Sequence, residues 1–365
     1  MRKQEKTPRA PSWSFIISKG GLAVMIALAT LLLVWCSRKS SEFATEKVRP
    51  FAEKTLGTMS KWFTFTGISV AEMLLYALIV VAVSSLITIV VRLITGPHRL
   101  KRLLSWLTGW ALLASLMFLM FEGLYGCSYA AESKLDTLGL EVRERSHEEL
   151  YDLCHWLMKE AEANREKAGF NAKTPGEETF FEDAEAVAKI VSAYTKTEQT
   201  SPKRVSLSKY MSYTNLTGVF CPFTGEANVN SNDMDIAVPF TMAHEIMHRW
   251  GVTAEDEANC FAFISLYESG EVRYRYSASY MGLLYTLPKL QKADKTLYKK
   301  LVGEMSDGLK ADINAYYTHW DQYEGKAAEV TSKVNNTYLV LQGEDDGVES
   351  YGKVVDWLLA YYAAL

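Results

Sequence analysis

Residues 244–259 read HEIMHRWGVTAEDEAN, and this stretch decides how the chain is organised. A helix brings residues four apart onto one face, so His244 and His248 can direct ring nitrogens at one metal ion. Glu245 then lies beside any water that the metal holds. Such a site polarises the water and supplies a base for its proton, which is the minimum equipment for metal-assisted hydrolysis.

A second helix, expected over residues 254–270, offers the third protein ligand. At about 100° per residue, Glu255 and Asn259 fall on one stripe of this helix, whereas Glu257 lies near the opposite side. We therefore expect Glu255 to complete the site and Asn259 to lie beside a ligand. Glu257 stays open as an alternative ligand or as a neighbour of the ligands, because wheel geometry ignores irregular turns.

Three segments near the N-terminus carry no charged residue, namely 20–36, 73–91 and 103–121. Each is close to the roughly 20 apolar residues that cross a bilayer core. A buried helix of such length in a soluble protein would normally show a polar face, and none of these does. The sequence therefore predicts a membrane domain over residues 1–126 with transmembrane helices at about 15–36, 70–92 and 103–125, followed by a soluble domain over 127–365.

Basic residues suggest the orientation of these helices. Two densely basic segments would lie on the same side of the membrane, and their residues are Arg2, Lys3, Lys6 and Arg9 in the first and Arg92, Arg99, Lys101 and Arg102 in the second. Positive loops remain in the cytoplasm. We therefore expect a multi-pass membrane protein whose C-terminal domain is extracytoplasmic.

The hydrophobic periodicity of the soluble domain changes from helical to strand-like and back to helical along the chain. Ser146 and Glu149 form a capping-box pattern ahead of an apolar helical repeat, and helical patterns return after residue 270. The stretch 204–230, rich in Val, Tyr, Phe and Thr and broken by glycines, predicts two or three short strands. The order of these elements predicts a mostly helical α+β fold with a small sheet.

Composition excludes some classes of binding partner and some kinds of metal site. Five cysteines without a close pair indicate neither a disulfide framework nor a cysteine-based metal site. A net charge of -4, without a basic face on the soluble part, argues against nucleic acid as a partner. The lipid bilayer and a peptide or protein substrate are the expected partners, and the oligomeric state stays open.

Several runs together carry a resemblance to a known family. They are 208–213 (SKYMSY), 223–230 (FTGEANVN), 239–241 (PFT), the two metal-helix motifs, 332–338 (SKVNNTY) and 346–352 (DGVESYG). With the three spans, they resemble a bacterial membrane family catalogued as a domain of unknown function. The resemblance covers the whole chain and implies the bacterial inner membrane as the location, but it implies little about activity.

The pair of metal-helix motifs is also similar to two gluzincin-like groups, the CAAX-processing membrane metalloproteases and the zinc proteases that cleave phage repressors. That similarity implies a zincin-like domain in which zinc is held by His244, His248 and Glu255, with Glu245 as the base. This chain departs from the CAAX group in having only six residues between the second histidine and Glu255. The turn between the two helices must therefore be tight.

The function expected from these patterns is a membrane-anchored zinc metallopeptidase. The oxyanion that develops during peptide-bond hydrolysis would need a hydrogen-bond donor besides the metal. Candidates by residue type are Tyr338, Tyr213 and Lys333. The stretch 223–230 is either an edge strand that pairs with an extended substrate or an ordinary strand of a small sheet. With the first alternative, Asn228 and Tyr213 are candidate substrate-binding residues.

Two other functions stay open. One is a membrane-anchored, non-catalytic zinc-binding or sensing protein, which a closed coordination sphere would favour. The other is an assembly or transporter-accessory protein whose spans carry the function, although functional polar groups inside a membrane are usually ionisable.

Overall fold

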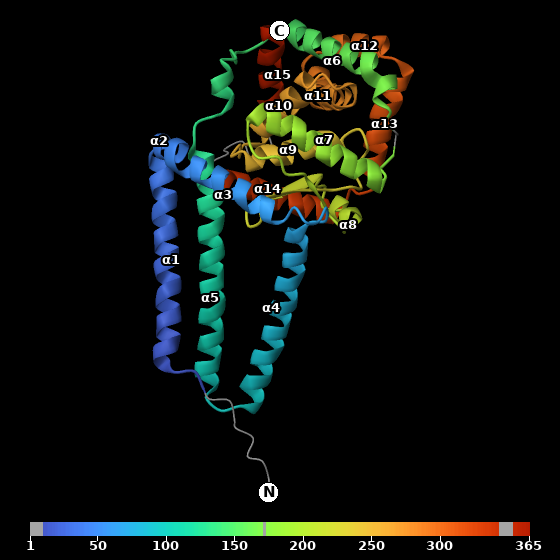
Figure 1. Cartoon of the computed structure of the whole chain (residues 1–365). Helices are drawn as coiled ribbons and strands as arrows, with labels where there is room; N and C mark the ends of the chain where they lie inside the picture. Colours follow the sequence, from blue (N-terminus) through green and yellow to red (C-terminus); the bar gives the residue numbers. More distant parts are fainter. Residues whose placement is uncertain (1–9, 171–172, 343–352) are drawn as a thin grey trace.

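A computed structural model describes residues 10–170, 173–342 and 353–365. The basic residues at positions 2–9 and the run 346–352 lie outside the described residues. Three long apolar helices stand side by side and carry a helical domain at one end (Figure 1). They are α1 (Trp13–Lys39), α4 (Val70–Thr95) and α5 (Arg99–Leu124). Each is long and apolar enough to cross a bilayer, which confirms the prediction of a membrane protein with three N-terminal spans.

The domain is mostly helical, as the sequence predicted. Its helices are α6 (His147–Ala168), α7 (Glu177–Thr195), α8 (Ser208–Ser212), α9 (Val238–Arg249), α10 (Glu255–Glu268), α11 (Val272–Ala293), α12 (Lys295–Glu304), α13 (Asp307–Asp321), α14 (Lys326–Gln342) and α15 (Lys353–Ala364). The expected capping box is formed at the start of α6, where Ser146 and Glu149 each bond the other's backbone N–H. Two short 3-10 segments, η2 (Gly126–Ala130) and η3 (Leu135–Leu138), lead from α5 into the domain.

Three short strands form the sheet expected in the stretch 204–230: β1 (Lys203–Arg204), β2 (Gly218–Cys221) and β3 (Glu226–Val229). Their order is β1-β3-β2, with β1 parallel and β2 antiparallel to β3. The alternative that residues 223–230 form an edge strand was wrong, because β3 is paired on both sides. The edge strands are β1, whose Arg204 is bridged by Ile68, and β2.

The connection between the first two spans is itself helical. It comprises α2 (Ser41–Phe43), the π-helical turn η1 (Ala44–Val48) and α3 (Arg49–Trp62). The buried face of α3 packs Ala52 and Leu56 against Tyr125 and Phe220. Gly225 has a φ of +70°, and a Cβ there would lie 2.5 Å from the Leu56 carbonyl oxygen, so only glycine allows this approach.

The start of α4 is fixed to the domain by two carboxylates. Glu226 in β3 accepts hydrogen bonds from the backbone N–H groups of Val70 (3.3 Å) and Ala71 (2.8 Å), where the helix dipole favours a negative charge. Glu72, one turn into the span, accepts from the backbone of Ser206 at 2.7 Å. The spans and the domain therefore form one packed unit.

Helix α9 lies at the centre of the domain, and every residue from Val238 to Arg249 is buried. It packs against α7, α10, α11 and the sheet. Apolar side chains such as Ile246 and Met247 join the main core. The polar side chains of α9 must then find partners inside the protein, since burying them alone is costly.

Candidate metal centre

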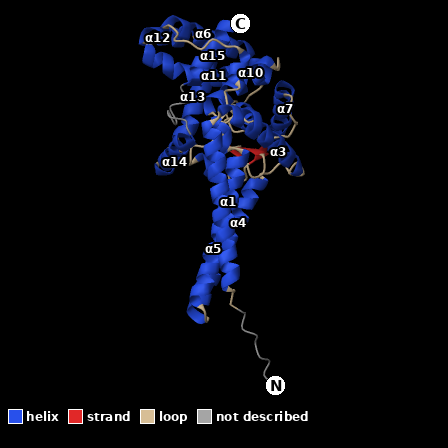
Figure 2. Cartoon of the chain, turned by 90° about the vertical axis from the view of Figure 1, so that its left-hand side faces the viewer, coloured by secondary structure: helices blue, strands red, loops and turns tan. Residues whose placement is uncertain are grey.

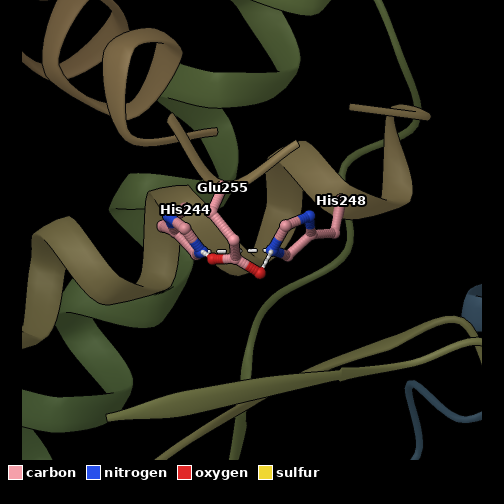
Figure 3. A group of neighbouring side chains, drawn as sticks. All are labelled: His244, His248 and Glu255. Atoms are coloured by element: carbon pink, nitrogen blue, oxygen red, sulfur yellow. Dashed lines mark hydrogen bonds and ion pairs between the residues drawn. The ribbon is translucent and has the colours of Figure 1, made fainter. Parts of the chain in front are cut away.

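Three side chains converge between α9 and α10 (Figure 3). The Nε2 atoms of His244 and His248 are 3.0 Å apart. Glu255 places one carboxylate oxygen 3.2 Å from Nε2 of His244 and the other 3.7 Å from Nε2 of His248. One ligand atom from each of the three residues lies within 4.8 Å of the others. The structure thus brings together the three residues that the sequence suggested as ligands.

A tight turn between the two helices makes this convergence possible. Helix α9 ends at Arg249, and Gly251 follows in the left-handed region with a φ of +75°. The Val252 N–H then donates to the Met247 carbonyl at 3.2 Å, which turns the chain back toward α9. Because α10 begins at Glu255, this carboxylate lies in its first turn, directly beside the histidines.

The remaining nitrogen of each histidine is held by an oxygen. His248 Nδ1 lies 2.8 Å from the Val252 carbonyl, which can only accept, so this nitrogen carries the proton and donates. His244 Nδ1 lies 2.8 Å from Asn259 Oδ1, to which the Tyr285 hydroxyl also donates at 3.1 Å. Partners of this kind fix the ring orientation of metal-binding histidines.

The electrostatics of the cluster suit a positive charge at its centre. Burial lowers the pKa of His248 to about 4, so its Nε2 carries a lone pair at neutral pH. Burial acts in the same direction on His244, but its hydrogen bond to Glu255 raises its pKa overall. The lone pair of His248 Nε2 and the carboxylate of Glu255 thus lie close together. Either a proton on His244 or a divalent metal can balance their negative potential.

The donor set fits zinc. Two imidazole nitrogens and one carboxylate are a known ligand set of catalytic zinc sites. Ligand nitrogens at about 2.0–2.1 Å in a tetrahedron would be roughly 3.3 Å apart, close to the 3.0 Å seen here.

Glu245 lies buried beside the three converging side chains. Its side chain is 4% exposed, and Oε2 has no hydrogen-bond partner among the described residues. Burial raises the pKa of this carboxyl to about 8, an increase that the neighbouring His244 opposes. The carboxyl lies against Gly218, the first residue of β2. A buried acceptor without a partner is costly and marks a functional candidate.

Glu257 lies away from the histidines. Its carboxylate accepts a hydrogen bond from the backbone N–H of Lys134 at 3.3 Å, next to η3. Burial raises its pKa to about 7. The structure therefore does not support Glu257 as a ligand or as a neighbour of the ligands. The regular helix places it on the other side of α10.

A cavity of about 570 Å³ adjoins the metal centre. Its walls come from the end of α5, the edge strand β2, α11 and α14. Among the lining residues, Tyr338 of α14 is the one that the sequence suggested as an oxyanion donor. Its hydroxyl lies 3.4 Å from that of Tyr129, and burial raises its pKa.

The two expected substrate-binding residues are not brought to the cavity. The Asn228 side chain is buried in the sheet, where it donates to the carbonyls of Val219 and Glu226. Tyr213 is exposed and stacks edge-on against Tyr323. Lys333 points into solvent from α14. The structure therefore gives no support to substrate contacts by Asn228 or Tyr213.

Two site residues escaped the sequence reasoning. The Tyr125 hydroxyl lies 3.2 Å from Nδ1 of His248, and the Tyr285 hydroxyl bonds Asn259. Both come from distant segments, and nothing in their local sequence distinguishes them from core tyrosines. A tyrosine directly after an apolar span is in addition a common interfacial residue.

Gly218→Ala is expected to lower turnover about a hundredfold without loss of metal. The added Cβ would lie 2.8 Å from Cδ of Glu245, so the carboxyl must move, and a displacement of about 1 Å can cost that much. Metal content and hydrolysis would be measured on the same preparation. Gly303→Ala is the control, because no atom lies within 4 Å of its added Cβ. Full turnover in Gly218→Ala would contradict the assigned position of Glu245.

Together, the fold and the site define an integral membrane protein with a mostly helical domain built around a candidate metal centre. The family model described as "Protein of unknown function (DUF3810)" matches residues 45–359, and the chain belongs to this family. No curated protein and no solved structure matches the chain.

Proposed function

We propose that the protein is a membrane-anchored zinc metallopeptidase. The observation that carries the proposal is the convergence of His244, His248 and Glu255 beside a cavity that also holds the unpartnered carboxyl of Glu245. A zinc ion held by the three ligands would supply a Lewis acid that polarises a water and a carbonyl. The other residues of the site would then have separate roles in proton transfer and in binding the oxyanion.

Glu245 would accept the proton of the attacking water and return it to the leaving amine. Its buried carboxyl needs no rearrangement to do so, because its Oε2 is not engaged by any described residue. Tyr338 and Tyr129, whose hydroxyls lie together in the cavity wall, are candidates for an additional oxyanion donor.

The edge strand β2 supports a peptide as substrate. Thr217, Gly218, Val219 and Phe220 line the cavity, and β2 pairs with β3 on one side only. An extended peptide can add to such an edge through main-chain hydrogen bonds. A purely structural zinc site would have four protein ligands, whereas here three ligand atoms converge among the described residues beside a cavity of about 570 Å³. This favours catalysis over a non-catalytic zinc-binding role.

Removal of the metal tests the proposal directly. Full-length protein in detergent, treated with a chelator, is expected to lose hydrolysis of an unstructured protein such as casein, and stoichiometric zinc is expected to restore it. Metal analysis before and after treatment provides the comparison. Hydrolysis that persists in metal-free protein would exclude the proposed mechanism.

We further propose that the domain lies outside the cytoplasm of a bacterial cell. Arg92 near the end of α4 and Arg99, Lys101 and Arg102 at the start of α5 belong to the helix ends that are remote from the domain (Figure 1). The positive-inside rule places the cytoplasm at this end of the spans. Protease added to intact spheroplasts is expected to digest the domain. Protection until the membrane is opened would indicate the reverse orientation.

A further inference from the structure

The candidate metal centre lies close to the point where α5 leaves its apolar segment. Residues 103–121 are uncharged, and Phe121, the last of them, lines the cavity. Tyr125 follows four residues later, about 6 Å along a helix, and its hydroxyl is 3.2 Å from His248. The polar headgroup layer on each side of a bilayer is roughly 5–8 Å thick. The metal centre is therefore at the height of the headgroups.

Helix α3 exposes an aromatic and basic face at this height. Phe51 and Trp62 of α3 are 61% and 68% exposed, away from the buried Ala52 and Leu56, and Phe65 in the turn after the helix is 78% exposed. Lys47 and Lys54 are exposed beside them. Aromatic rings and lysines whose alkyl stems lie along apolar surface are typical of segments that rest at a membrane interface.

Helix α14 has two faces with different environments. Val330, Val334 and Leu341 are exposed along one stripe of the helix. Asn335 and Tyr338 line the cavity from the same helix. One helix thus connects the outer surface of the protein with the wall of the site.

Exposed large apolar side chains are distributed unequally over the domain. Along α6, α7, α10, α11, α12 and α15, none of the described residues belongs to this class. Outside the spans, most of these side chains lie on or next to α3, α8, β2 and α14, whereas Leu138, Val142, Tyr317 and Leu365 lie elsewhere. Figure 2 shows α3 and α14 on opposite sides of the spans, where the spans meet the domain. These surfaces continue the apolar surface of the spans.

We propose that the exposed faces of α3 and α14 rest in the headgroup layer and that the substrate is a polypeptide anchored in the same membrane. The substrate class rests on the proposed function, whereas the contact with lipid does not. Anchoring confines both partners to one surface and raises the effective concentration of a cleavable segment held near that surface. A segment only a few residues from its own membrane span can reach the cavity without leaving the bilayer.

The contact with lipid is tested by quenching in vesicles of a bacterial lipid mixture. A fluorophore is attached to Val334→Cys or Phe51→Cys, in full-length protein with Cys36 and Cys221 replaced by serine. Val142→Cys is the control, because Val142 is 47% exposed and lies outside the α3 and α14 faces. Lipids with a nitroxide near the headgroup are expected to quench positions 334 and 51 several-fold more than position 142. Equal quenching at all three positions would overturn the proposed contact.

The substrate class is tested with one peptide library in two forms. It is presented to the reconstituted protein either in solution or fused to a single apolar transmembrane helix in the same vesicles. The anchored form is expected to be cleaved with at least a tenfold higher rate at equal bulk concentration, and Glu245→Gln protein corrects for contaminating proteases. Equal cleavage of both forms would overturn the substrate class and leave the metallopeptidase proposal intact. Cleavage of neither would overturn both, while the quenching result would still decide the contact with lipid.

Discussion

Glu245→Gln is expected to reduce peptide hydrolysis by a factor of about 10²–10⁴, the usual contribution of a general base. The amide has nearly the same shape but cannot accept the proton of the water. Zinc content should remain unchanged, because the three converging ligand atoms belong to His244, His248 and Glu255. Turnover is measured with an anchored and a soluble peptide, and zinc by elemental analysis of the same sample.

A matched control exists for this variant. Glu257 is also a glutamate of α10 whose pKa burial raises, but it is only partly buried and faces η3 instead of the cavity. Glu257→Gln should therefore retain turnover close to that of the unmodified protein. Retained hydrolysis in zinc-loaded Glu245→Gln would remove Glu245 from the role of base and leave the chemistry to other groups in the cavity.

Glu255→Gln is expected to weaken zinc binding by more than about a hundredfold. Loss of even a partner of a ligand costs about 10–100-fold in metal affinity, and here a ligand itself would be lost. The neighbouring His244 would also lose the carboxylate that raises its pKa. Zinc affinity is measured by competition with a chromogenic chelator at fixed pH.

Glu257→Gln again provides the comparison, since the two glutamates are two positions apart on one helix. Its zinc affinity should be unchanged. Weak binding in Glu257→Gln together with tight binding in Glu255→Gln would show that α10 presents its other face to the metal, and the assigned ligand set would then be wrong.

Much of the architecture could be predicted because its signals are local. A charge-free segment of sufficient length predicts an apolar helix wherever it lies, and all three such segments are helical here. The capping box at Ser146 likewise depends only on residues within one turn. The phase of a helix separates Glu255 from Glu257 for the same reason, because neighbouring positions on α10 are fixed relative to each other.

What could not be predicted depends on long-range packing. The order of the strands places β2 at the edge, although its sequence and that of β3 are equally compatible with that position. Tyr125 reaches His248 across 123 positions of sequence, and Gly218 meets Glu245 only because β2 passes beneath α9. Such pairings depend on the register of distant segments, which no local pattern encodes.

The close fit of α3 and Tyr125 against the domain has a practical consequence for anyone who handles this protein. A fragment that starts at residue 127 would lack Tyr125, Ala52 and Leu56, and Phe220, now 8% exposed, would face water. The truncated domain would tend to aggregate, and His248 would have lost the neighbouring hydroxyl of Tyr125. Proteolytic cleavage between the spans and the domain would for the same reason inactivate the protein instead of releasing an active soluble fragment.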